Sequence, residues 1–328
     1  MIRPAIASTS DGMELGIIGA GIMGERLLRA AQGQSSIHIA GIWDPAPDTL
    51  ARLVAELPGT PTLPSPDSVI AAADCVYIAS PPASHLGHAR AALAAGKAVF
   101  CEKPLSVDVA DGKRFLTETA GSRIAVNFPF ASSLAVAQLT HWLSEGATGT
   151  PNALAITVAF ATWPRGWQHA AASWLDRPEQ GGFTREVVSH FLFLARRLFG
   201  PLTLRDAHAA FPDAARSERA ITARLQAGTL PVTLTGTVGQ TPEDDLNSFT
   251  VSGPNGSVRL RNWATAERLA GQDWQPDPNA IPHVQARPLV LQRQLESVAR
   301  MTRGEPHPLA TATEAFEVQT VVEAILRS

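Results

Sequence analysis

The sequence has 328 residues, of which 45% are hydrophobic and 17% charged, and its formal net charge at pH 7 is −3. This composition is typical of a folded globular chain, and the length exceeds what one hydrophobic core usually supports, so two domains are expected. The negative charge and the absence of any Lys/Arg-rich run exclude a broad nucleic-acid-binding surface.

The two cysteines, Cys75 and Cys101, lie in apolar runs without a CxxC motif or neighbouring histidines. This pattern excludes a disulfide framework and a four-ligand zinc site, and it favours a reducing compartment. The first twelve residues contain no apolar core of signal-peptide length, and no apolar run in the sequence approaches transmembrane length. A cytoplasmic protein without a metal or a membrane partner is therefore expected.

The first predicted strand, near residues 14–18, leads into the glycine-rich run GAGIMG and then a helix. Each glycine has a physical role in a dinucleotide site: Gly19 makes the tight turn, Gly21 lets the backbone approach a pyrophosphate, and Gly24 lets helix and strand pack closely. Ile22 and Met23 begin the helix, whose free N–H groups face the phosphates. The alternative is a glycine-rich turn in some other α/β protein.

A second strand, residues 37–44, ends in Asp44, which lies twenty residues after Gly24. That spacing fits a carboxylate that accepts hydrogen bonds from the ribose hydroxyls and repels a 2′-phosphate. The first basic residue after it is Arg52, a turn or more into the next helix. NAD is therefore expected as the cofactor, and NADP is the weaker alternative.

Strands at 74–80, 97–104 and 122–128 alternate with helices at 84–96 and 109–121, which predicts a doubly wound parallel sheet over residues 1–128. Ligands of such sheets bind beyond the carboxyl ends of the strands. Ser80, Pro81, Glu102 and Lys103 lie at those ends and are expected to contact the cofactor, whereas a solvated strand-end lysine is the alternative for Lys103.

The segment 162–182 contains Trp163, Arg165, Trp167 and Arg177. Tryptophan rings cover the C–H faces of sugars, and guanidinium groups reach hydroxyls or a carboxylate, so these four residues are candidate substrate contacts. A loop packed by tryptophans for stability alone is the alternative.

Residues 181–200, GGFTREVVSHFLFLARRLFG, read as a buried helix that nevertheless carries Glu186 and His190 four residues apart. The spacing puts both side chains on one face. A satisfied core histidine or a surface ion pair would explain them without a function, and a catalytic pair would explain them with one.

Residues 129–328 combine a helix at 134–145 with long segments of alternating polarity, which predicts an α+β domain built on a large, mostly antiparallel open sheet. The uncovered face of that sheet is a candidate interface. A C-terminal helix could pack back on the first domain.

A nicotinamide cofactor implies hydride transfer, for which the protein supplies proton transfer and orientation. The only tyrosine, Tyr77, lies in a core strand without the lysine of a Tyr-x-x-x-Lys pair, and cysteine ligands for a catalytic zinc are lacking. A site with an arginine clamp for a 2-hydroxy acid would leave the strand-end lysine unexplained. A lysine–histidine site with Lys103 and His190 remains.

Four stretches make the sequence similar to the glucose–fructose oxidoreductase / inositol 2-dehydrogenase / rhizopine catabolism (Gfo/Idh/MocA) family. They are GIIGAGIMG, DCVYIASPPASHLGHARAALAAGKAVFCEKPLS, GGFTREVVSH and the closing ATATEAFEVQTVVEAILRS. The resemblance implies that Lys103, Glu186 and His190 flank the nicotinamide and the reacting carbinol, and it adds His85 to the cofactor contacts. It also implies a homodimer or homotetramer formed through the open sheet.

The sequence departs from the family pattern in the same helix, where Glu186 replaces the usual aspartate and Phe183 and Val188 replace glycines. The usual Arg-Phe after the strand at 122–128 is also absent, since Ala131 and Ser132 stand there. The expected activity is NAD-dependent oxidation of a secondary alcohol of a sugar, polyol or sugar acid, or the reverse reduction. His190 would accept the proton, Glu186 would orient the imidazole, and Lys103 would bind the reacting oxygen.

Two other functions stay open at this point. One is reduction of a non-sugar carbonyl or a dihydrodiol-type substrate. The other is a sugar-sensing regulator that binds NAD without catalysis, although such a sensor has no need of a proton acceptor.

Overall fold

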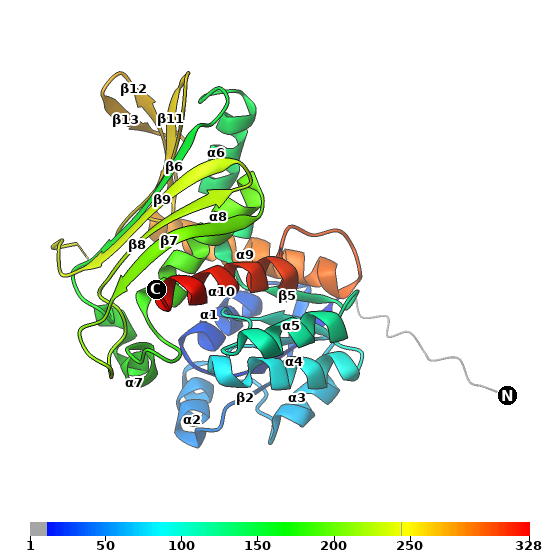
Figure 1. Cartoon of the computed structure of the whole chain (residues 1–328). Coiled ribbons are helices and arrows are strands. Elements are labelled where there is room, and N and C mark those ends of the chain that lie inside the picture. Colours follow the sequence, from blue (N-terminus) through cyan, green and yellow to red (C-terminus); the bar gives the residue numbers. More distant parts are fainter. Residues whose placement is uncertain (1–11, 244) are drawn as a thin grey trace. The chain divides into compact units, whose positions relative to one another are not determined.

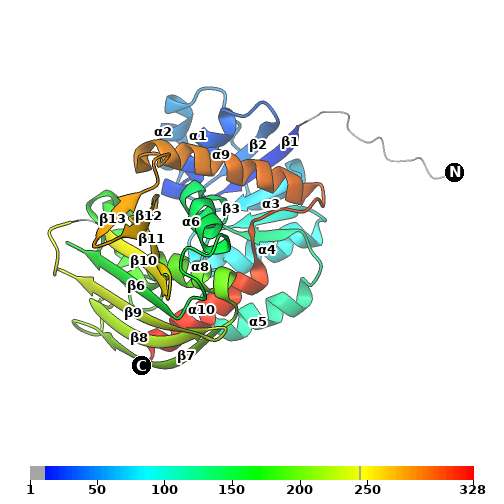
Figure 2. The same cartoon turned by 90° about the horizontal axis from the view of Figure 1, so that it is seen from above.

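A computed structural model describes residues 12–243 and 245–328, leaving aside the side chains of residues 169–172. The chain forms two compact units, which are shown in Figures 1 and 2. Of the described residues, the first consists of residues 12–102, 119–125 and 295–307, and the second of residues 103–118, 126–243, 245–294 and 308–328. The domain boundary expected at residue 128 stays a prediction.

The first unit is built around a parallel sheet with the strand order β5-β4-β3-β1-β2. Strand β1 pairs in parallel with β2 and β3, and β3 pairs in parallel with β4. The predicted parallel sheet is confirmed. Its strands are β1 (Met13–Ile18), β2 (Ile37–Trp43), β3 (Cys75–Ile78), β4 (Ala98–Cys101) and β5 (Ile124–Val126). Its helices are α1 (Ile22–Gln32), α2 (Pro47–Glu56), α3 (Pro66–Ala72) and α4 (His85–Ala94), with a 3₁₀ turn at Pro82–Ser84.

The central strands of this sheet are buried along their whole length. All four residues of β3 and all four of β4 are fully inaccessible to solvent. Helices that pack on a parallel sheet cover both of its faces, so such strands read as continuous apolar runs. This is why the segments around Cys75 and Cys101 show no alternation of polarity.

The second unit contains an eight-stranded sheet with the order β13-β12-β11-β10-β6-β9-β8-β7. Neighbouring strands pair antiparallel, except that β6 and β9 are parallel, so the predicted mostly antiparallel sheet is confirmed. The strands are β6 (Ala153–Phe160), β7 (Leu202–Ala210), β8 (Ala220–Ala227), β9 (Leu230–Val238), β10 (Leu246–Gly253), β11 (Gly256–Arg261), β12 (Thr265–Ala270) and β13 (Asp273–Pro276).

Helices cover one face of this sheet. Figure 2 shows α6, α8 and α10 on the same side of the strands. Along β8 and β9, buried residues alternate with exposed ones, as expected for a sheet with one face in the core. The helical segments of this unit are α5 (Val109–Glu118), α6 (Leu134–Ser144), α7 (Ala172–Leu175), α8 (Ser189–Phe199) and α10 (Ala312–Leu326), with 3₁₀ turns at Pro129–Ser132 and Gly166–Ala171. A short strand, β14 (Ala310–Thr311), precedes α10.

Two parts of the fold were not expected from the sequence. One is the hairpin of β12 and β13, and the other is α9 (His283–Thr302), the longest helix, which carries Pro288 inside it. A proline within a helical pattern normally predicts a break. Among the described residues, no helix is both long and apolar enough to cross a bilayer.

Candidate active site

In the first unit, the glycine-rich turn between β1 and α1 can only be built from glycine at two positions. Gly19 has a φ of +101°, and a Cβ added there would lie 2.6 Å from the backbone N of Ser80. A Cβ on Gly24 would lie 1.9 Å from the carbonyl oxygen of Gly19. At Gly21, in contrast, a Cβ would meet nothing within 4 Å, so the backbone faces open space there. These are the roles that a pyrophosphate-binding turn requires of its glycines.

Asp44 lies directly against this turn. Its carboxylate accepts hydrogen bonds from the backbone N–H groups of Ala20, at 2.7 Å, and Ala46, at 2.9 Å. The nearest following cation, Arg52, is engaged by Glu25 at 2.7 Å and Glu56 at 2.9 Å. A paired guanidinium is a poor partner for a 2′-phosphate, because binding would first have to break these charge-assisted hydrogen bonds.

Ser80, Pro81 and His85 lie together after β3. The Nε2 atom of the buried His85 is 2.8 Å from the carbonyl oxygen of Ser80, so His85 fixes the backbone at this strand end. Ile22 and Met23 form the first turn of α1, as expected.

The strand end at Glu102 is held by the only tyrosine in the sequence. The hydroxyl of Tyr77 donates to Oε1 of Glu102 at 2.5 Å, inside the core of the first unit. Tyr77 therefore has a positioning function that the sequence did not indicate. Lys103 follows Glu102 directly in the chain.

In the second unit, the ammonium of Lys103 forms an ion pair of 2.8 Å with the carboxylate of Glu186, and both side chains are largely buried. Among the described residues, the carboxylate of Glu186 accepts no hydrogen bond from the imidazole of His190, and its predicted role in orienting that imidazole stays a prediction. Two physical reasons explain why Glu186 pairs with Lys103. Residues Thr184–Val188 form a π-helical turn instead of the expected α-helix, which changes the rotation between the two positions, and an ammonium is a stronger partner for a carboxylate than a neutral imidazole.

His190, in the first turn of α8, is buried among aromatic rings. Its imidazole lies edge-on to Phe128 and Trp263, each with ring centroids 5.4 Å away, and its Nδ1 atom has no hydrogen-bond partner among the residues that the structure describes. Burial, and then the positive charges of Lys103 and Arg165, hold the pKa of His190 well below its usual value of 6.5. The imidazole is therefore neutral at pH 7 and can accept a proton.

Three of the four predicted substrate contacts, Trp163, Arg165 and Trp167, form one cluster. The guanidinium of Arg165 lies 5.7 Å from the ring centroid of Trp163 and 4.8 Å from that of Trp167. It is buried and paired with Asp245 at 2.9 Å. Trp163 is buried, Trp167 is 46% exposed, and only Trp167 therefore offers an open ring face.

Arg177 is exposed, and its Nε donates weakly to the carbonyl oxygen of Ser173, at 3.4 Å. No contact of Arg177 with His190 or with Arg165 is recorded within the described part of the chain. Its predicted role in substrate binding stays a prediction.

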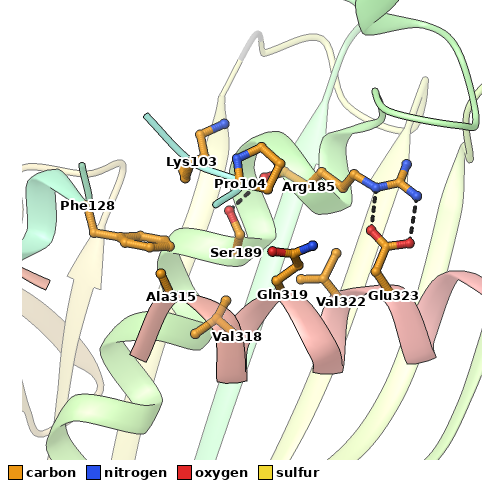
Figure 3. Close-up of a pocket in the computed structure, with 10 residues that line it drawn as sticks. All are labelled: Lys103, Pro104, Phe128, Arg185, Ser189, Ala315, Val318, Gln319, Val322 and Glu323. Carbon is orange, nitrogen blue, oxygen red and sulfur yellow. Dashed lines mark hydrogen bonds and ion pairs between the residues drawn. The ribbon is translucent and has the colours of Figure 1, made fainter. Parts of the chain in front are cut away.

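Helix α10 contacts the segments next to Lys103 and Glu186, and Figure 3 shows its residues Gln319 and Glu323 with Lys103 and Arg185. The buried guanidinium of Arg185 donates to both carboxylate oxygens of Glu323, at 2.6 and 2.9 Å. One turn earlier on α10, the side-chain amide of Gln319 accepts from the backbone N–H of Ser106 at 3.1 Å and donates to the carbonyl oxygen of the same residue. These contacts enclose a small pocket that Lys103 also lines.

Within residues 12–243 and 245–328, no three His, Cys, Asp or Glu side chains gather as they would around a metal ion. The groups that can act chemically are a glycine-rich turn in the first unit, and a neutral imidazole and an ammonium with its carboxylate counter-ion in the second. This set includes one group that can bind a dinucleotide and one that can transfer a proton.

The comparison with protein families agrees with this set. Residues 13–128 match the model of the Gfo/Idh/MocA family, described as an oxidoreductase family with an NAD-binding Rossmann fold. Inositol 2-dehydrogenase 3 of Saccharopolyspora erythraea is 34% identical over 148 residues, which cover 42% of this chain and 43% of that protein. Inositol 2-dehydrogenase of Cereibacter sphaeroides is 38% identical over 112 residues, covering 34% and 33%. The chain thus spans less than half the length of the curated relatives it matches.

Solved structures match over nearly the whole chain. A levoglucosan dehydrogenase in complex with NADH has a TM-score of 0.83 at 18% identity, with 97% of this chain and 96% of that chain covered. The WlbA dehydrogenase of Bordetella pertussis, in complex with NADH and UDP-GlcNAcA, has a TM-score of 0.82 at 21% identity, with 98% and 96% covered. At these identities the likeness establishes the fold of both units.

Proposed function

We propose that the chain transfers hydride between NAD and a secondary alcohol or ketone of a sugar, polyol or sugar acid, because residues 13–128 match the Gfo/Idh/MocA oxidoreductase family and inositol 2-dehydrogenases are among its partial relatives. The observation that carries the proposal is His190, a buried imidazole kept neutral by its surroundings and subject to the positive charge of Lys103. A neutral imidazole is the form that accepts the hydroxyl proton of an alcohol.

The residues of the first unit fit NAD. Gly19, Gly21 and Gly24 supply the turn on which the pyrophosphate would lie, and Asp44 stands beside that turn as the acceptor for a ribose hydroxyl. Ser80, Pro81, His85 and Glu102 lie at the strand ends of the same sheet. When bound, NAD would supply the acceptor for a hydride.

The protein's own part in the oxidation is to move one proton and to orient the alcohol. The C–H bond of the carbinol breaks with its electron pair leaving as hydride, and the O–H proton passes to His190. The ammonium of Lys103 donates a hydrogen bond to the oxygen as it becomes a carbonyl. Glu186, paired with Lys103, holds that ammonium in place.

A dehydrogenase assay of the purified protein tests this function and its cofactor. We expect reduction of NAD with at least one member of a panel containing myo-inositol, aldoses, uronates and acyclic polyols. NAD should exceed NADP in kcat/KM by roughly tenfold or more, equivalent to about 1.4 kcal/mol, because Asp44 repels a 2′-phosphate and Arg52 is already paired. Turnover of no member with either cofactor would contradict the function, and equal use of NADP would contradict the role of Asp44.

We also propose that the chain forms homodimers or homotetramers through the face of the eight-stranded sheet opposite its helices, and that it is cytoplasmic. Exposed threonines meet across three neighbouring strands on that face, where Thr157 pairs with Thr235 and Thr235 with Thr222. Such short uncharged side chains allow two sheets to approach closely.

Light scattering tests the proposed assembly. The wild-type protein should have at least twice the mass of one chain, and Thr235→Arg should reduce it to the mass of one chain. An arginine in the turn between β8 and β9, Thr229→Arg, is the control and should leave the mass unchanged. A monomeric wild-type protein would contradict the interface.

A further inference from the structure

The turn between β11 and β12 has a backbone conformation that its sequence does not favour. Asn262 has a φ of 43° and Trp263 a φ of 74°. Where a hairpin turn has two successive residues with positive φ, Asn followed by Gly is the preferred pair. Asn262 fits this preference, but Trp263 stands where glycine would be free of strain.

A tryptophan in the left-handed region is strained, and the surrounding contacts must offset that strain. The turn is held by Asn247, whose carbonyl oxygen accepts from the N–H of Asn262 at 2.9 Å and whose N–H donates to Oδ1 of Asn262 at 2.8 Å. These contacts depend on Asn262 alone, so the turn itself does not require a tryptophan. The reason for the tryptophan must lie in where its ring goes.

The indole of Trp263 lies against the candidate proton acceptor. Its ring centroid is 5.4 Å from that of His190 and 5.4 Å from that of Phe130. His190 and Phe130 are buried, with 7% and 3% of their surfaces exposed, whereas Trp263 is only partly buried. The indole is therefore partly exposed while it packs on His190, Phe130 and Phe191.

We propose that Trp263 is a substrate-contacting residue, whose partly exposed indole packs on the C–H face of a cyclic polyol or pyranose while its hydroxyl meets His190. This inference rests on the proposed function and narrows its substrate class to ring compounds. An aromatic ring in a binding site supplies a flat apolar surface, and a ring substrate with equatorial hydroxyls presents a matching one. An acyclic polyol has no such rigid face and gains less from the contact.

The test uses the full-length protein, NAD, and two probes: the best ring substrate and the best acyclic polyol of the assay panel. Trp263→Gly should fold, because glycine adopts a φ of 74° without strain. We expect its KM for the ring substrate to rise at least tenfold, while its KM for NAD stays unchanged. The KM of Trp263→Phe for the ring substrate should lie between those of Trp263→Gly and the wild type. The preference for ring over acyclic substrate should shrink accordingly.

The matched control for Trp263→Phe is Trp274→Phe. Trp274 lies on β13, where the guanidinium of Arg259 stacks on its indole at 4.1 Å from the ring centroid. This control should leave both KM values within twofold of the wild type. A Trp263→Gly protein with unchanged KM for the ring substrate would overturn the inference while leaving the proposed function intact. A fall in kcat alone would also overturn it, because the ring would then act through His190 without touching the substrate. If the wild-type protein turned over no substrate, the proposed function itself would be contradicted, whatever the behaviour of the Trp263 variants.

Discussion

Replacing His190 by alanine is expected to lower kcat by roughly 10²–10⁴-fold while leaving the affinity for NAD largely intact, since that is the usual contribution of a general base. Lys103→Ala should lower kcat by a comparable factor, because the developing carbonyl oxygen loses its charged donor. Stopped-flow measurement of NADH formation and fluorescence titration with NADH provide the two readouts. Near-wild-type turnover by the His190 variant would show that His190 is not the general base and has only a structural role in this helix.

The matched control for these variants is His208→Ala, on β7 and away from the aromatic cluster, which should keep its turnover. The same assay run against pH gives a second readout. Burial and the positive charges of Lys103 and Arg165 hold the pKa of His190 well below 6.5. The imidazole therefore stays deprotonated at pH values at which an ordinary histidine is already protonated. The acid limb of kcat/KM should thus lie below pH 6.5, and a midpoint at or above 6.5 would contradict the described surroundings of His190.

The same lowered pKa has a consequence for folding. An unfolded chain binds a proton at this histidine near pH 6.5, whereas the folded chain does not until lower pH. The unfolded state therefore binds more protons in that interval, and the contribution of His190 to stability falls as pH drops below 6.5.

The parallel sheet and the glycine turn were predictable because local physics determines them. Gly19 must adopt a positive φ, and Gly24 has no room for a Cβ. Both positions therefore require glycine, which can be recognised in the sequence. The same holds for the buried strands around Cys75 and Cys101. The long helix α9 was not predictable in this way, because Pro288 contradicts the helical pattern that tertiary packing nevertheless maintains.

The sequence indicated candidate residues for the site, but it did not indicate how their side chains pair. Spacing placed Glu186 and His190 four residues apart, but it could not show that Lys103 competes for the carboxylate or that the first turn is π-helical. Trp263 could not be predicted from the sequence, because its position depends on a positive φ that tryptophan disfavours. A single Asn at a hairpin position was the only local signal, and it indicates a turn without indicating what the next side chain touches.

Replacing Glu323 by alanine is expected to lower the free energy of unfolding by about 3–5 kcal/mol, because it leaves the buried charge of Arg185 without its counter-ion. The value should fall toward the lower end of that range, since Arg185 still donates to the carbonyl oxygens of Pro178 and Gly181. Urea denaturation monitored by circular dichroism measures the change. Glu305→Ala breaks an ion pair with Arg303 that is about half exposed, and the stability of this control should change much less, because solvent screens the two charges.

The activity of the Glu323 variant separates two functions of α10. Arg185 directly precedes Glu186, and one turn earlier on α10 Gln319 holds Ser106, three residues after Lys103. If the ion pair fixes the start of the helix that carries Glu186, kcat should fall well below that of the Glu305 control even at temperatures where the variant is fully folded. A destabilised variant with wild-type kcat would show that Glu323 supports the fold of the second unit and leaves the Lys103–Glu186 geometry untouched.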